Sequence, residues 1–174
     1  MNTFKFTAGI ATAVLLGACQ SMSSDGPKAT AELQPTKGST VRGNVSFVQV
    51  GDKVHVNARV TGLAPNREFG FHIHEAGDCS SGDGMSTKGH FNPFGKPHAH
   101  AGTPERHAGD LTSLKSDGGG NASLSVDLDI ITVAPGPASV VGRGLIVHAQ
   151  SDDYKTQPTG NAGARSACAV IHRS

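Results

Sequence analysis

Tryptophan is absent from the sequence, tyrosine occurs once, and only 17% of the residues are charged. No run of 18 or more apolar residues is present, so the sequence predicts no permanent transmembrane helix. The formal net charge is +1, and no basic run occurs, which argues against nucleic acid as a partner. A chain of 174 residues is long enough for one domain with a sizeable core.

Glycine is abundant, with 23 residues. Short β-branched runs lie between turns rich in Gly, Pro, Asn and Asp, which predicts an all-β fold. Residues 40–60 alternate apolar and polar side chains on both sides of Gly51-Asp52, a pattern typical of a β-hairpin. His55 lies opposite the valines of this pattern, and we expect it to face solvent. Further strands are expected near residues 70–75, 122–130, 145–148 and 167–171.

The first 18 residues have the form of an export signal. Lys5 provides a weakly basic start, and the apolar run 6–16 is too short to span a bilayer permanently. Leu16 lies three residues before Cys19 and small residues lie between them, which resembles the lipobox of bacterial lipoproteins. In that interpretation Cys19 is lipidated and begins the mature chain. The alternative is an ordinary export signal cut near Ala18, with Cys19 incidental.

Residues 19–38 are expected to form the lipidated cysteine and a flexible tether, because they show no apolar periodicity. The folded domain is then expected to span residues 39–174. Either form of the signal predicts an exported protein on the periplasmic side of the cell envelope. With a lipid on Cys19 the protein is expected to be membrane-anchored. The residue that follows Cys19 is Gln20 and not Asp, which in bacterial lipoproteins favours the outer membrane. Without the lipid it is soluble in the periplasm.

Histidine is the residue in excess, because six of the nine fall between His72 and His107. Side chains alternate along a strand, so His72 and His74 share one face while Ile73 points to the opposite face and the core. Two neutral imidazoles that converge on one point are typical ligands of a transition metal. A single histidine is more often a hydrogen-bonded structural residue, but this arrangement predicts a metal site.

Two long stretches lack a strand pattern, residues 75–110 and 151–165. Loops of this length in a compact domain need a functional or covalent reason. If Cys19 is lipidated, Cys79 and Cys168 remain, and an even number in an oxidising compartment favours a disulfide. That bond would close a loop of about 90 residues and tie the first long stretch to the last strand. The alternative, in which the two thiolates bind a metal, lacks a partner cysteine at short ligand spacing.

Four segments resemble the signature segments of the copper,zinc superoxide dismutase family, in the family's order and with family-like spacing. They are Gly70-Phe71-His72-Ile73-His74-Glu75, His90-Phe91-Asn92-Pro93, His107-Ala108-Gly109-Asp110 and Gly160-Asn161-Ala162-Gly163-Ala164-Arg165. The resemblance covers about residues 40–171, and the export signal is similar to that of exported bacterial members. It implies an eight-stranded antiparallel Greek-key β-sandwich or flattened barrel, immunoglobulin-like, with two long functional loops.

The resemblance also implies one copper ion and one zinc ion per subunit. It assigns copper to His72, His74, His90 and His148, and zinc to His90, His98, His107 and Asp110. His90 serves both metals as a bridging imidazolate. Copper needs imidazoles that suit both oxidation states and a position open to substrate, whereas zinc accepts a closed tetrahedral set with one carboxylate. His100 matches no ligand position, although it repeats the one-apart spacing with His98.

Two further residues correspond to functional residues of the family. Asp152 resembles the carboxylate that links a copper histidine to a zinc histidine, which would fix the ring orientations. The alternative is that Asp152 is half of an exposed Asp152-Asp153 turn. Arg165 corresponds to the active-site arginine beside the open copper position, and the alternative is a surface arginine in a glycine-rich loop. Arg165 and His90 are therefore the expected catalytic residues, for anion attraction and proton transfer.

The implied activity is superoxide dismutation, in which two superoxide radicals and two protons give oxygen and hydrogen peroxide as copper alternates between Cu(II) and Cu(I). It would protect the cell envelope from extracytoplasmic superoxide, and the enzyme would be a monomer or a homodimer. One alternative is a non-catalytic copper-buffering or copper-delivery protein of the same fold, although such relatives usually lack a metal ligand. Another is a structural zinc module, which would not need a second histidine set.

Overall fold

The structure is a computed structural model, and it describes Met1 and residues 26–174. Apart from Met1, the expected export signal lies outside these residues, and so does the expected lipid on Cys19. Within the part of the chain described, no helix has both the length and the apolar character needed to cross a membrane.

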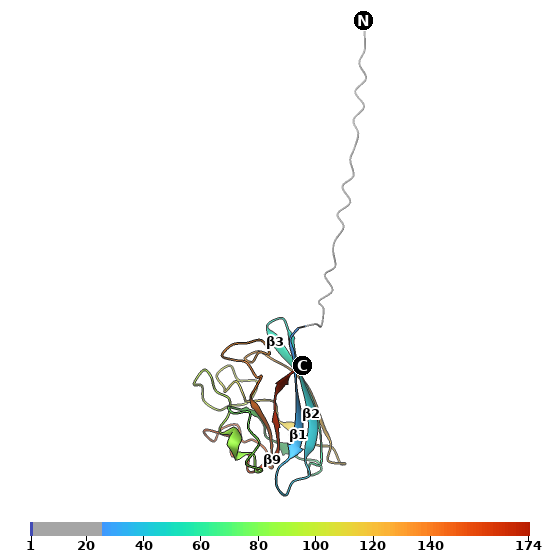
Figure 1. The fold of residues 1–174 in the computed structure, drawn as a ribbon, viewed down its shortest axis with the longest axis vertical. Helices are drawn as coiled ribbons and strands as arrows, with labels where there is room; N and C mark the ends of the chain where they lie inside the picture. Colours follow the sequence, from blue (N-terminus) through green and yellow to red (C-terminus); the bar gives the residue numbers. More distant parts are fainter. Residues whose placement is uncertain (2–25) are drawn as a thin grey trace.

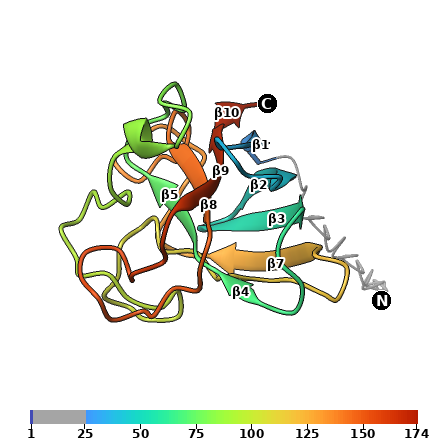
Figure 2. The same cartoon turned by 90° about the horizontal axis from the view of Figure 1, so that it is seen from below.

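The described chain folds as antiparallel strands with one short 3-10 helix and no α-helix (Figure 1). The strands are β1 Lys28–Pro35, β2 Arg42–Val50, β3 Lys53–Thr61, β4 Glu68–Phe69, β5 Phe71–His74, β6 Leu114–Lys115, β7 Ala122–Leu128, β8 Gly144–His148, β9 Arg165–Val170 and β10 His172–Arg173, and the 3-10 helix η1 is Met85–Thr87. Eight strands form one sheet in the order β5-β8-β9-β1-β2-β3-β7, with β10 paired to β1, while β4 and β6 form a second, two-stranded sheet. The larger sheet curls around the core (Figure 2). The expected all-β antiparallel fold of the sandwich or flattened-barrel type is confirmed.

The predicted hairpin is strands β2 and β3, which pair from Arg42–Thr61 to Val50–Lys53 around the Gly51-Asp52 turn. Its alternating apolar residues face the core, where Phe47 and Val56 form a fully buried cross-strand pair. Each such side chain contributes about 1.5–3 kcal/mol by leaving water. His55 lies on the outer face, as expected, where its Nδ1 is 2.6 Å from Asp127 Oδ1.

The expected tether is wrong in its second half, because Lys28–Pro35 is strand β1. This strand pairs with β2, β9 and β10, so its backbone polar groups are satisfied inside the sheet. Ala29, Ala31 and Leu33 alternate with exposed residues and are buried. The period of two is present in the sequence, but two of its three apolar positions are alanines, which produce a weak signal. The folded domain therefore includes β1 and begins before residue 39.

Cys79 and Cys168 form the expected disulfide, which joins the first long loop to β9. The alternative in which these sulfurs bind a metal is wrong. The bond spans 89 positions of the sequence. On chain-entropy grounds, a loop of that size contributes about 4–5 kcal/mol to stability. The disulfide also holds the loop near Arg165, which begins β9.

Candidate metal centre

Strand β5 is the last strand of the larger sheet, and the first long loop pairs with its outer edge. The Phe91 N–H donates to the Ile73 carbonyl, and the Ile73 N–H donates to the Gly109 carbonyl, at 2.8 and 2.9 Å. The resulting bridges place His90 opposite His74 and Asp110 opposite His72. On the other side of β5, strand β8 ends in His148. The sheet edge thus gathers side chains that are far apart in the sequence.

The first cluster contains four buried histidines whose nitrogens lie within 4.8 Å of one another, namely His72, His74, His90 and His148. In each ring one buried nitrogen has no hydrogen-bond partner: Nδ1 of His72 and Nε2 of the other three. A buried polar atom without a partner costs about 1–3 kcal/mol, so four at one point require an explanation. A metal ion bound by all four nitrogens would satisfy them together.

The opposite nitrogens of three of these rings are held by the protein. Nε2 of His72 lies 2.7 Å from Asp152 Oδ2. Nδ1 of His74 donates to the Lys88 carbonyl at 2.8 Å, and Nδ1 of His148 donates to the Gly163 carbonyl at 3.2 Å. Such contacts fix the tautomer and the ring orientation, as around metal-binding histidines.

The second cluster contains three imidazoles and one carboxylate, from His90, His98, His107 and Asp110, all buried. Asp110 Oδ1 lies 2.9 Å from Nδ1 of His90 and of His98, and 3.5 Å from Nδ1 of His107. Three nitrogens and one oxygen that converge in this way fit a closed tetrahedral zinc site.

His90 belongs to both clusters, and each cluster takes a different nitrogen of its ring. Nδ1 faces Asp110 in the second cluster, whereas the unpartnered Nε2 faces the first. A single imidazole therefore lies between the two candidate sites. This is the geometry that a shared ligand requires.

Asp152 also connects the two clusters, through one histidine of each. Its Oδ2 accepts from His72 Nε2 at 2.7 Å, and its Oδ1 lies 2.9 Å from His98 Nε2. The backbone N–H of Tyr154 also donates to Oδ1, at 2.7 Å. Because Asp152 is 5% exposed, it is not half of an exposed turn.

Arg165 is anchored beside the first cluster. Its guanidinium donates to the carbonyl of Gly84, to the hydroxyl of Thr87 and to the carbonyl of Lys88. The Lys88 carbonyl also accepts from His74, so one oxygen connects the arginine with a histidine of the first cluster. Arg165 is therefore held near the candidate copper ligands and is not a free surface residue.

Burial sets the charge state of three rings of the first cluster, those of His74, His90 and His148. It lowers the pKa of His90 to about 4 and that of His148 to about 3, and together with His90 it lowers the pKa of His74 far below the usual range. These rings are neutral at pH 7, and neutral imidazole is the form that binds metal.

The pKa of His98 shifts in the opposite direction. Burial lowers its pKa, but hydrogen bonds to Asp110 and Asp152 outweigh burial and raise the pKa to about 9. In the metal-free protein, His98 therefore carries a proton that a metal ion must displace. The two carboxylates already supply the negative charge that favours a cation at this position.

The second long loop contributes residues that sequence reasoning missed. Gln157 pairs with the backbone of His98 twice, accepting from its N–H and donating to its carbonyl, both at 2.8 Å. Gly160 has φ +68°, and a Cβ there would collide with the Asp152 carboxylate and the His98 ring. Only the position of Gly160 in a signature segment could have indicated it. His100 lies in neither cluster, as expected, and packs edge-on against Tyr154.

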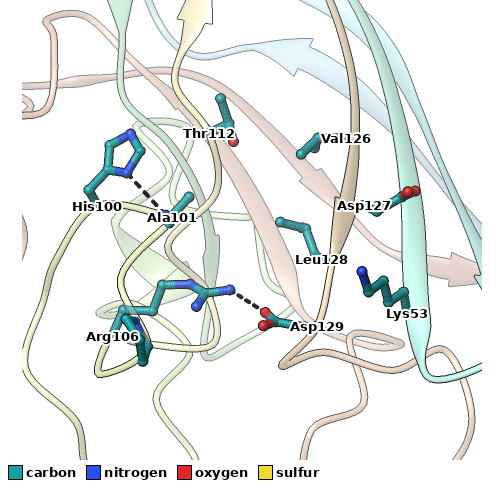
Figure 3. A pocket seen from close by; sticks show the side chains of 11 residues that line it. Lys53, His100, Ala101, Arg106, Thr112, Val126, Asp127, Leu128 and Asp129 are labelled. Atoms are coloured by element: carbon teal, nitrogen blue, oxygen red, sulfur yellow. Dashed lines mark hydrogen bonds and ion pairs between the residues drawn. The ribbon is translucent and has the colours of Figure 1, made fainter.

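A separate open cavity of about 390 Å³ lies between β7 and the first long loop (Figure 3). Arg106 lines it and forms an ion pair with Asp129 at 2.7 Å. No residue of either histidine cluster lines this cavity, so it is distinct from the metal centre.

Comparison with known proteins agrees with this geometry. The family model described as "Copper/zinc superoxide dismutase (SODC)" matches residues 41–171. A relative from Aquifex aeolicus, "Superoxide dismutase [Cu-Zn] 2", is 38% identical over 171 residues, which cover 96% of this chain and 99% of the relative. "Superoxide dismutase [Cu-Zn]" from Paramecium bursaria Chlorella virus 1 is 42% identical over 137 residues, covering 75% and 72%. A solved structure described as the clock protein EA4 aligns with a TM-score of 0.76 at 41% identity, covering 87% of this chain and 96% of that one.

Proposed function

Because the chain belongs to the copper/zinc superoxide dismutase family and is a superoxide dismutase that binds copper and zinc, we propose which of its two clusters binds each metal. Copper is bound by His72, His74, His90 and His148, and zinc by His90, His98, His107 and Asp110. Four imidazoles suit both Cu(II) and Cu(I), whereas three imidazoles and a carboxylate suit zinc. The observation that carries this assignment is that His90 presents one nitrogen to each cluster.

The bound copper supplies the one-electron change between Cu(II) and Cu(I) on which dismutation depends. His90 is proposed to hold a proton at Nε2 between the two half-reactions and to release it toward the peroxide product. Its Nδ1 stays beside Asp110, which keeps the ring in place while Nε2 changes state. Asp152 fixes the orientations of the His72 and His98 rings, so that both clusters keep their geometry through the cycle.

Replacing His148 with Ala tests the copper assignment, because it removes one imidazole of the copper set and none of the zinc set. We expect copper affinity to fall at least about 100-fold, since even residues that only support a ligand change affinity 10–100-fold. Dismutation should be lost while zinc is retained. Metal analysis and suppression of superoxide-driven cytochrome c reduction measure the two effects on one sample.

His172→Ala is the matched control, because this exposed histidine of β10 lies outside both clusters. Full activity in the His148 variant would contradict the assignment. Full copper occupancy without dismutation in the unaltered protein would instead favour the copper-buffering alternative.

Arg165 is proposed to attract superoxide to the open copper position. Three acceptors hold its guanidinium, so its positive charge stays fixed beside the copper set. A fixed charge of this kind raises association rates and acts less strongly as salt screens it. Superoxide dismutases are an established example of such steering.

In the Arg165→Ala variant, kcat/KM should fall about 10-fold or more at low salt, within the range known for electrostatic steering. The dependence of the rate on ionic strength should become shallower, because the attracting charge is gone. Arg165→Lys, which keeps the charge, should retain most of the salt dependence. Equal salt dependence in the Ala variant and the unaltered enzyme, at equal metal content, would refute the steering role.

We also propose that the enzyme works on the periplasmic side of the cell envelope, anchored through a lipid on Cys19, and protects it from extracytoplasmic superoxide. Leu16 and the small residues before Cys19 support lipidation. The Cys79–Cys168 disulfide supports an oxidising compartment, because such bonds persist outside the cytosol.

Cys19→Ser tests the anchor. In a bacterial host supplied with labelled fatty acid, the unaltered chain should carry the label and sediment with membranes. The Ser variant should carry no label and leave the membrane fraction. An unlabelled, soluble wild-type protein would establish the alternative, an ordinary signal cut near Ala18.

A further inference from the structure

Tyr154 is the only tyrosine of the chain and lies in the second long loop, two residues after Asp152. Its backbone is left-handed, with φ +59°. A bulky residue rarely adopts this conformation, which persists only where the surroundings impose it. Other contacts of Tyr154 must therefore hold it.

The side chain of Tyr154 makes those contacts. Its hydroxyl donates to Oε1 of Glu68 in β4 at 2.5 Å and shares a second hydrogen bond with the buried Ser113, at 2.8 Å between the oxygens. Its ring packs edge-on against His100 of the first loop, with 4.8 Å between centroids. One side chain thus connects the second loop to β4, to the segment before β6 and to the first loop.

The backbone of Tyr154 transmits this anchoring to the metal centre. Its N–H donates to Asp152 Oδ1 at 2.7 Å. The same oxygen contacts His98 Nε2, while the other carboxylate oxygen contacts His72. Displacement of Tyr154 would therefore move the hydrogen-bond donor that orients Asp152.

We propose that Tyr154 is a positioning residue, which fastens the second loop to β4 and thereby holds Asp152 between His72 and His98. The inference rests on the proposed metal sets, because Asp152 matters only if these histidines bind metal. Gln157 ties the same loop to the backbone of His98. Loss of the tyrosine anchor therefore loosens Asp152 without releasing the whole loop.

The test is Tyr154→Phe, which keeps the ring and its packing but removes the hydroxyl. Zinc release from the metal-loaded protein to excess chelator should become about 10-fold faster, as for other losses of support around a metal ligand. Ser125→Ala, which removes an exposed hydroxyl on β7, should release zinc at the wild-type rate.

Glu68→Gln alone and combined with Tyr154→Phe completes a double-mutant cycle. If both residues act through one hydrogen bond, the double variant should release zinc no faster than Tyr154→Phe alone. Fully additive effects would contradict the proposed anchor. So would a faster zinc release in Tyr154→Phe that is matched by an equal loss of stability in the metal-free protein, because the role would then be structural only.

Asp152→Asn in the same assay separates this inference from the proposed function. Wild-type zinc release from that variant would overturn the role of Asp152 in the metal centre, and the anchor with it. Fast release from Asp152→Asn with wild-type release from Tyr154→Phe would overturn the anchor alone and leave the metal assignment intact.

Discussion

The metal centre depends on backbone hydrogen bonds between the first long loop and the outer edge of β5. An edge strand leaves one row of backbone N–H and C=O groups unpaired. Here the loop backbone at residues 91 and 109 forms hydrogen bonds with the C=O and the N–H of Ile73. Because Ile73 faces the core, its two neighbours His72 and His74 face the loop, and the same pairing brings His90 and Asp110 beside them. Gly109 is required at the closest approach, since a Cβ there would collide with the Ile73 carbonyl.

Burial of these side chains has two opposing effects. It keeps His90 and His148 neutral, with pKa values of about 4 and 3, and therefore ready to bind metal. It also leaves four ring nitrogens without partners, which costs free energy that bound metal recovers. Asp110 and Asp152 have the opposite effect on His98, because their hydrogen bonds raise its pKa and stabilise its protonated, positively charged form. The fold thus keeps His90 and His148 neutral and places two carboxylates beside His98, and the His90 ring is shared by both clusters.

Sequence patterns predicted the parts of this structure that repeat locally. The alternation of β2 and β3 predicted the hairpin, and the spacing of His72 and His74 predicted a shared face. β1 was missed because alanines fill two of its three apolar positions. Tyr154 and Gln157 could not be recognised, because their roles depend on how two irregular loops meet in space. His98 and His100 have the same local spacing pattern, and only the resemblance to a family separated ligand from surface residue.

Electron paramagnetic resonance can test directly whether His90 is a ligand of both metal sites. A sample with one copper ion in the first cluster and one cobalt(II) ion in the second is compared with a sample that holds copper and zinc. If one imidazole links the metals, exchange coupling should abolish the Cu(II) signal in the cobalt sample and leave it intact in the zinc sample. An undiminished Cu(II) signal in a sample with full copper and cobalt occupancy would contradict the shared ligand.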